Sequence, residues 1–78
     1  MAKNYTIRQS VRDALTAIPA NSDFKGYDFL KACRKFLIIN GNFAKPYDST
    51  LLRDLRHFRH EFKITVTNSS KSIYHKGE

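Results

Sequence analysis

Residues 46–76 decide the fold of this chain, and they read PYDSTLLRDLRHFRHEFKITVTNSSKSIYHK. Apolar side chains recur in the first half at the spacing of one helix face, namely Leu51, Leu52, Leu55, Phe58 and Phe62. Asp48 precedes them and is expected to cap the helix, because its carboxylate accepts hydrogen bonds from the first unpaired amides. The spacing therefore predicts a helix over about residues 49–61.

A two-stranded ribbon is expected directly after this helix. Residues 64–67 alternate between apolar and polar side chains, which is the period of a strand. Residues 68–70 are Asn-Ser-Ser and favour a turn, and residues 72–76 return as the partner strand. The last two residues, 77–78, are expected to be loose.

The face of the helix that points away from the apolar stripe is polar and basic. A rotation of about 100° per residue places on this face Ser49, Thr50, Arg53, Arg56, His57 and His60. Arg53 is the best candidate for contact with a DNA base, because its planar guanidinium matches the O6 and N7 edge of guanine. A solvated helix charge, paired with a neighbour such as Asp54, is the alternative. Arg56 is expected to contact phosphate, as are Lys71 and Lys76.

The other polar residues of this helix allow two interpretations each. Ser49 and Thr50 could donate to phosphate at the helix N-terminus, where unpaired amides favour anions, but ordinary capping is equally expected. Arg59 lies closer to the apolar stripe and is expected to cover the core with its stem. His57 and His60 share a side. Without a Cys pair or a carboxylate cluster nearby, they favour contact with DNA or solvent over a metal site.

The N-terminal part of the chain predicts a first helix over about residues 6–18. Thr6 and Gln9 form a capping-box pair, in which each side chain accepts from the backbone amide of the other residue. Apolar residues then recur at helical spacing until Pro19, whose ring and missing N–H oppose continuation. Residues 1–5 are expected to be a loose arm, because nothing periodic begins before residue 7.

A very short strand and a second helix are expected to follow. The segment around Phe24 is extended but short, and it could pair with the later ribbon. Helical spacing predicts the second helix over about residues 27–38, and Gly41 is free to take the positive φ that ends helices. Phe43 and Tyr47 are expected to anchor the next connection to the core.

Composition limits the classes of protein. The 78 residues include 14 Lys and Arg against seven Asp and Glu, and the net charge of +7 favours a polyanionic partner. One folded domain over residues 1–78 is expected from this length and from 41% hydrophobic residues. Cys33 is the only cysteine, so no internal disulfide forms, and it is expected to be a buried apolar side chain. No apolar run approaches bilayer length, so we expect no membrane partner and a cytoplasmic protein, nucleoid-associated if bacterial.

The predicted order of helix, short strand, helix, turn, helix and hairpin resembles the winged helix-turn-helix DNA-binding superfamily over nearly the whole chain. The most specific part is residues 48–59, DSTLLRDLRHFR, which are similar to the third helices of such domains. Residues 71–76, KSIYHK, are similar to the second strand of the wing. The family often has Gly shortly after the third helix, where this chain has Glu61-Phe62-Lys63.

This resemblance implies an α+β fold, mostly α, with three helices and a C-terminal β-hairpin wing. The third helix would lie in the major groove, and the hairpin would reach adjacent backbone or minor groove. The resemblance carries DNA contact over to Ser49, Thr50, Arg53, His57 and His60 on the helix. On the wing it carries DNA contact over to Asn68, Ser69, Ser70 and Lys71.

We therefore expect a small protein that binds double-stranded DNA, such as a transcriptional regulator or another DNA-associated factor. The alternative is a winged-helix module that binds a protein, and an acidic partner would suit the net charge. Scattered carboxylates and the lack of a Gly-rich phosphate loop argue against an enzyme, and no cofactor or metal is expected. Most of the four Tyr and six Phe fall at core-facing positions, which makes single-stranded nucleic acid the less favoured partner. A monomer or a weak, DNA-assisted dimer is expected.

Overall fold

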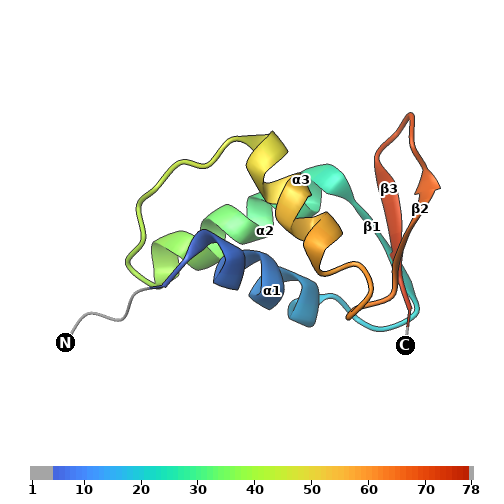
Figure 1. Cartoon of the computed structure of the whole chain (residues 1–78), viewed down its shortest axis with the longest axis horizontal. Helices are drawn as coiled ribbons and strands as arrows, with labels where there is room; N and C mark the ends of the chain where they lie inside the picture. Colours follow the sequence, from blue (N-terminus) through green and yellow to red (C-terminus); the bar gives the residue numbers. More distant parts are fainter. Residues whose placement is uncertain (1–4, 78) are drawn as a thin grey trace.

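The computed structural model describes residues 5–77, which form a small α+β domain of three helices and a three-stranded antiparallel sheet. Figure 1 shows the helices gathered on one side of the molecule and the sheet at the other end. In chain order the elements are α1 (Ile7–Ala17), β1 (Ser22–Lys25), α2 (Gly26–Ile39), α3 (Asp48–His57), β2 (Ile64–Asn68) and β3 (Ile73–Lys76). The expectation of an α+β fold with three helices and a C-terminal hairpin is confirmed.

The sheet has the strand order β1-β3-β2, so the last strand along the chain is its central strand. Tyr74 of β3 is paired with Phe24 of β1 on one side and with Val66 of β2 on the other. A bulge interrupts the β2–β3 pairing between Val66 and Asn68. The short strand predicted near Phe24 is therefore confirmed, and it does pair with the hairpin.

Both ends of α1 are fixed by side chains. Thr6 Oγ1 accepts from the Gln9 amide at 3.1 Å and Gln9 Oε1 accepts from the Thr6 amide at 2.8 Å, so the predicted capping box is confirmed. At the other end, Lys76 Nζ donates to the carbonyls of Leu15 at 2.7 Å and Ile18 at 2.6 Å. The Lys76 ammonium therefore caps this helix, which competes with the phosphate contact predicted for it.

The end of α2 is a Schellman motif. Gly41 has φ +79°, its amide donates to Ile38 O at 3.1 Å, and the Asn42 amide donates to Leu37 O at 2.8 Å. The positive φ expected at Gly41 is confirmed.

The connection over residues 40–47 is held by polar bonds. Asn42 Nδ2 donates to Tyr5 O at 2.6 Å, and Arg34 Nη2 donates to Pro46 O at 3.3 Å. Phe43 is 74% exposed and Tyr47 is 79% exposed, so the prediction that they anchor the connection to the core is wrong. Hydrogen bonds to backbone carbonyls take the place of the expected aromatic contacts.

The two segments predicted to be loose are fixed where the structure describes them. The Tyr5 hydroxyl donates to the Asp13 carboxylate, and burial together with this bond raises the pKa of Tyr5. The Gly77 amide donates to Lys63 O at 3.0 Å. The expectation is therefore wrong for Tyr5 and Gly77, while residues 1–4 and 78 lie outside the described residues.

Helix α3 ends at His57, four residues earlier than predicted. The Phe58 amide already bonds to Leu55 O as well as Asp54 O, and the Arg59 amide bonds to Arg56 O, which tightens the chain into turns. Phe62 keeps contact with Phe58, with the ring centroids 6.2 Å apart. Apolar spacing therefore continues through residues 58–63 although the α-helix does not.

The start of α3 also differs from the prediction. Tyr47 occupies the N-cap position and makes no capping hydrogen bond through its side chain. Asp48 instead pairs with Arg34 Nη2 at 2.5 Å. The prediction of Asp48 as the N-cap is therefore wrong, because its carboxylate ties α3 to α2.

The core lies between the helices and the inner face of the sheet. Its buried side chains include Val11, Leu15, Phe29, Leu51, Leu55, Phe58 and Ile64. Leu52 and Phe62 are partly buried against this cluster, so the predicted apolar stripe is confirmed as the packing face of α3 and the turn after it. Cys33 is fully buried, as predicted, and burial raises the pKa of its thiol to about 12. Within residues 5–77, no helix is long and apolar enough to cross a bilayer.

Candidate nucleic-acid interface

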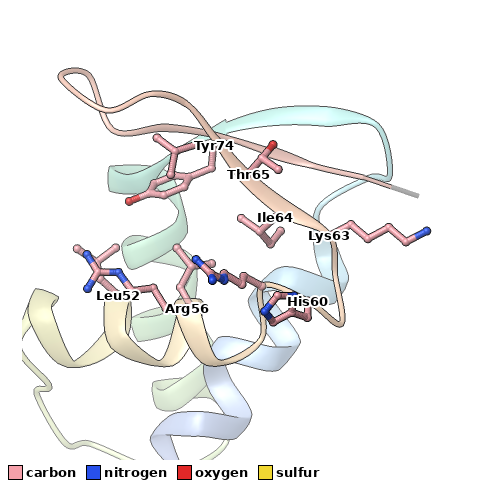
Figure 2. A pocket seen from close by; sticks show the side chains of 10 residues that line it. Leu52, Arg56, His60, Lys63, Ile64, Thr65 and Tyr74 are labelled. Atoms are coloured by element: carbon pink, nitrogen blue, oxygen red, sulfur yellow. The ribbon is translucent and has the colours of Figure 1, made fainter.

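A groove of about 580 Å³ separates α3 and the turn after it from the hairpin. Its apolar lining comes from Leu52, Leu55, Ile64, Val66 and Tyr74. Its polar lining includes Arg56, Arg59, His60 and Lys63. Figure 2 shows Arg56 rising from α3 toward the hairpin and Tyr74 lying over α3, while Lys63 extends outward at one end. We call this feature the α3–hairpin groove.

The turn over residues 58–63 sets one end of the α3–hairpin groove. The Ile64 amide donates to Arg59 O at 2.8 Å, and Lys63 has φ +53°. Lys63 thus adopts the left-handed conformation, which glycine takes without steric cost and other residues rarely adopt. This conformation turns the chain from α3 into β2 and leaves Arg59 and His60 exposed.

The basic side chains of the α3–hairpin groove have no acidic partner. Among residues 5–77, neither Arg56, Arg59 nor Lys63 forms an ion pair with a carboxylate. The same holds for Arg53 on the exposed side of α3 and for Lys71 at the hairpin. These five residues leave a positive charge on this side of the domain that nothing in the described chain compensates.

Most carboxylates are engaged by other partners. Asp54 pairs with Arg8 at 3.6 Å, Glu61 with Arg12 at 3.0 Å, and Asp23 with His75 at 2.6 Å. Asp13 accepts from the Tyr5 hydroxyl, and Asp48 pairs with Arg34. Since Asp54 is buried and faces α1, it does not neutralise Arg53, and the alternative of a paired helix charge finds no support.

The structure divides the predicted helix face into two parts. Arg56 and His60 line the α3–hairpin groove, whereas Arg53 is exposed on α3 outside it. Ser49 and Thr50 lie in the first turn of α3.

The two histidines lie on either side of the end of α3. The ring of His57, the last residue of α3, meets Phe58 edge-on at 5.1 Å between centroids. His60 lies in the turn and lines the α3–hairpin groove. They are separated because the helix ends between them. The described residues contain no group of three His, Cys, Asp or Glu side chains that could hold a metal ion.

The predicted wing residues form the tip of the hairpin. Asn68 Oδ1 accepts from the Lys71 amide at 3.1 Å and from Ser70 Oγ at 2.9 Å, and Ser69 O accepts from the Ser72 amide at 3.3 Å. Asn68 and Ser70 thus order the turn. Ser69, Ser70 and Lys71 are exposed at the tip, and Lys71 is the charged residue among them.

A second hollow of about 400 Å³ continues past the α3–hairpin groove, and Leu52 and Tyr74 line both. Its other walls come from the starts of α2 and α3 and from the hairpin, and they include Tyr27, Asp48 and Lys71. The fold therefore brings Lys71 of the hairpin next to the start of α3.

Sequence reasoning missed Arg59 and Lys63 as residues of this interface. Arg59 was expected to cover the core, yet it lines the α3–hairpin groove. The cluster of basic residues Arg56, Arg59, His60 and Lys63 within eight positions was a usable signal. Comparisons with family models, curated proteins and solved structures find no match for this chain. Its function is therefore inferred from its own geometry and charge.

Proposed function

We propose that this chain is a winged helix-turn-helix protein that binds double-stranded DNA, as a transcriptional regulator or another DNA-associated factor. The hairpin that follows α3 directly corresponds to the wing, and β1 supports it from the far side of β3. The connection over residues 40–47 is longer than the turn of about three to four residues that is usual in helix-turn-helix units.

The observation that carries the proposal is the set of unpaired cations that α3, its turn and the hairpin present together. A helix such as α3 is about 10–12 Å across with its side chains, which fits the major groove of about 12 Å width. In this arrangement Arg53 reaches a base edge, while Arg56 and Arg59 bind phosphates of the strand beside the α3–hairpin groove. Lys63 and Lys71 contact the backbone next to it.

Ser49 and Thr50 supply the anion contact at the other end of α3. The Ser49 amide belongs to the first helical turn, where unpaired N–H groups point outward, whereas the Thr50 amide donates to Tyr47 O at 3.0 Å, so Thr50 offers only its hydroxyl. Asp48 beside them is neutralised by Arg34, which reduces its repulsion of a phosphate. The first turn of α3 is therefore compatible with a polyanion in spite of its carboxylate.

The salt dependence of binding tests this proposal. Four phosphate contacts, from Arg56, Arg59, Lys63 and Lys71, predict that the affinity for a random duplex falls about 10²-fold between about 50 and about 200 mM salt. Fluorescence anisotropy with a labelled duplex measures it. An affinity that does not change with salt would contradict electrostatic binding to the DNA backbone.

Recognition of an acidic protein is the second candidate function, and a separate surface favours it. Ile38, Ile39 and Phe43 are exposed at the end of α2 and in the connection after it, and Lys35 and Lys45 beside them are exposed as well. Apolar side chains flanked by lysines suit a segment that is both apolar and acidic.

Selection from a library of displayed random peptides tests this second candidate. Enrichment of acidic, apolar peptides that Ile39→Ser no longer binds would support it, and the same variant should bind duplex DNA unchanged. Failure to enrich such peptides would leave DNA as the only supported partner.

A further inference from the structure

The second hollow differs in chemistry from the α3–hairpin groove that it continues. Its floor is formed by Leu30 and Leu52, and phenol rings come from Tyr27 at the start of α2 and Tyr74 on β3. Lys71 is its one basic lining residue, in contrast to the two arginines of the α3–hairpin groove. One continuous depression is therefore cationic along one part and aromatic along the other.

The two tyrosines present ring surface that the core does not use. One face of Tyr74 is stacked on Phe24, with 5.4 Å between the ring centroids and 20° between the planes. The ring of Tyr74 lines both hollows and lies over Leu52 in Figure 2. Tyr27 is 73% exposed, although its aromatic ring would favour burial. These rings are available to a flat ligand.

The charges of the second hollow fit an aromatic ligand that carries a phosphate. Asp48 would repel an anion, but its carboxylate is paired with Arg34 at 2.5 Å. Lys71 has no carboxylate partner among residues 5–77. An uncharged ring beside a phosphodiester matches this combination of apolar floor, phenol rings and ammonium group.

A fully paired duplex cannot use these rings, because its bases are stacked and offer only their edges in the grooves. An unpaired nucleotide offers the face of its base, which stacks on aromatic side chains without regard to sequence. The length of α3 corresponds to about four nucleotides, at about 1.5 Å per residue and about 3.4 Å per nucleotide along a strand. A strand on Arg56 and Arg59 therefore reaches the second hollow within a few nucleotides.

We propose that this depression holds a strand that leaves a DNA duplex, with an unpaired base against Tyr27 and Tyr74. This inference rests on the proposed function, because the exposed side of α3 holds the paired part of the same DNA. The phosphates of the departing strand lie on Arg56 and Arg59, and Lys71 binds the phosphate beside the unpaired base. The preferred ligand is a duplex with a single-stranded overhang.

Binding of three labelled duplexes by the 78-residue chain tests the inference. They share one paired sequence and end bluntly, in a 5′ overhang or in a 3′ overhang of about four thymidines, the length that α3 spans. We expect one overhang polarity to bind about tenfold more tightly than the blunt duplex, the effect of stacking about one base. Anisotropy at one fixed salt concentration gives the three affinities.

A pair of tyrosine variants locates the effect. Tyr27→Ser should abolish the preference for an overhang and leave the affinity for the blunt duplex unchanged. Tyr47→Ser is the matched control, because Tyr47 is equally exposed but does not line the second hollow, and it should keep the preference. Both side chains lie outside the core, so neither change should unfold the domain.

The outcomes separate this inference from the function on which it rests. Equal affinity for all three duplexes, or an overhang preference that survives in Tyr27→Ser, would overturn the inference and leave duplex binding intact. The isolated overhang strand is measured as a fourth probe, and tighter binding of it than of any duplex would overturn the duplex proposal and the junction with it. The absence of binding to every probe would overturn both.

Discussion

Replacement of Lys76 by methionine should destabilise the fold without removing a DNA contact. The Lys76 ammonium donates to two carbonyls at the end of α1, those of Leu15 and Ile18. It also lies 5.3 Å from the centroid of the Phe62 ring. Lys76→Met keeps most of the apolar stem and removes only the charged donor, so the change isolates the capping contribution.

The size of the effect follows from these contacts. A hydrogen bond from a charged donor contributes about 1.5–3 kcal/mol, and because Lys76 is half-buried we take the lower end of that range for both bonds together. The contact with Phe62 adds about 0.5 kcal/mol at a partly exposed site. The expected loss is therefore about 2 kcal/mol, which lowers the midpoint of thermal unfolding by about 8–16 °C for a domain of this size.

Thermal and urea unfolding followed by circular dichroism measure this loss, with Lys71→Met as the control. Lys71 is exposed at the hairpin tip, so its replacement should change stability by less than about 0.5 kcal/mol but should weaken binding to every duplex. Lys76→Met, measured where it is folded, should bind duplexes like the natural chain. A stable Lys76→Met variant with weakened DNA binding would refute the structural role of this side chain.

Further predictions concern the interface, the turn after α3 and the core. Arg53→Gln should lower the free-energy difference between binding the preferred base pair and binding another one at a single position by about 1–3 kcal/mol. Selection of bound duplexes from a random pool detects this loss of preference. Arg56→Gln should weaken all duplexes alike and reduce the slope of log affinity against log salt by about one unit, as measured by anisotropy. Lys63→Gly should raise the free energy of unfolding by about 1 kcal/mol, because φ at this position is +53°. Gly77→Ala should lower the free energy of unfolding, because the new Cβ would lie 2.9 Å from Lys63 Cβ. Urea unfolding measures both changes. Cys33 is fully buried and should resist a thiol reagent until the chain unfolds. The free energy of unfolding should fall as the pH rises above 9.0, because the unfolded thiol ionises there while burial raises the pKa of the native thiol to about 12.

The parts of the fold that depend on local patterns are predictable from the sequence. Thr6 and Gln9 lie three residues apart, and a capping box needs no other part of the chain. The apolar stripe through Leu51 and Leu55 indicates a helix with one buried face, because the period of the stripe matches that of the helix. Gly41 is a reliable helix end because it takes a positive φ without steric cost.

The features that sequence reasoning missed depend on contacts between distant residues. The pairing of Asp48 with Arg34 removes the expected N-cap, and no local pattern contains both residues. Phe43 and Tyr47 were expected to be buried because aromatic side chains usually are, but polar bonds hold their segment instead. The end of α3 was placed too late because Phe62 continues the apolar period beyond the point where the backbone amides bond three residues back, to Leu55 O and Arg56 O.

The candidate interface was only partly predictable for the same reason. A helical wheel identifies Arg53 and Arg56 as exposed on α3, but it contains no information on where the hairpin lies. Arg59 and Lys63 become part of the interface only when the hairpin folds back and closes a groove beside them. Charge pairing is also nonlocal: Arg12 and Glu61 neutralise each other although they are far apart in the chain.

The central position of β3 determines when the domain can fold during its synthesis on the ribosome. Because β3 pairs with β1 and β2 on its two sides, neither earlier strand has its partner until residues 73–76 have been synthesised. Lys76, which caps α1, belongs to the same segment. Until then the nascent chain holds helices without a sheet, so native structure should appear late and in one step, and such nonlocal pairing makes folding slow.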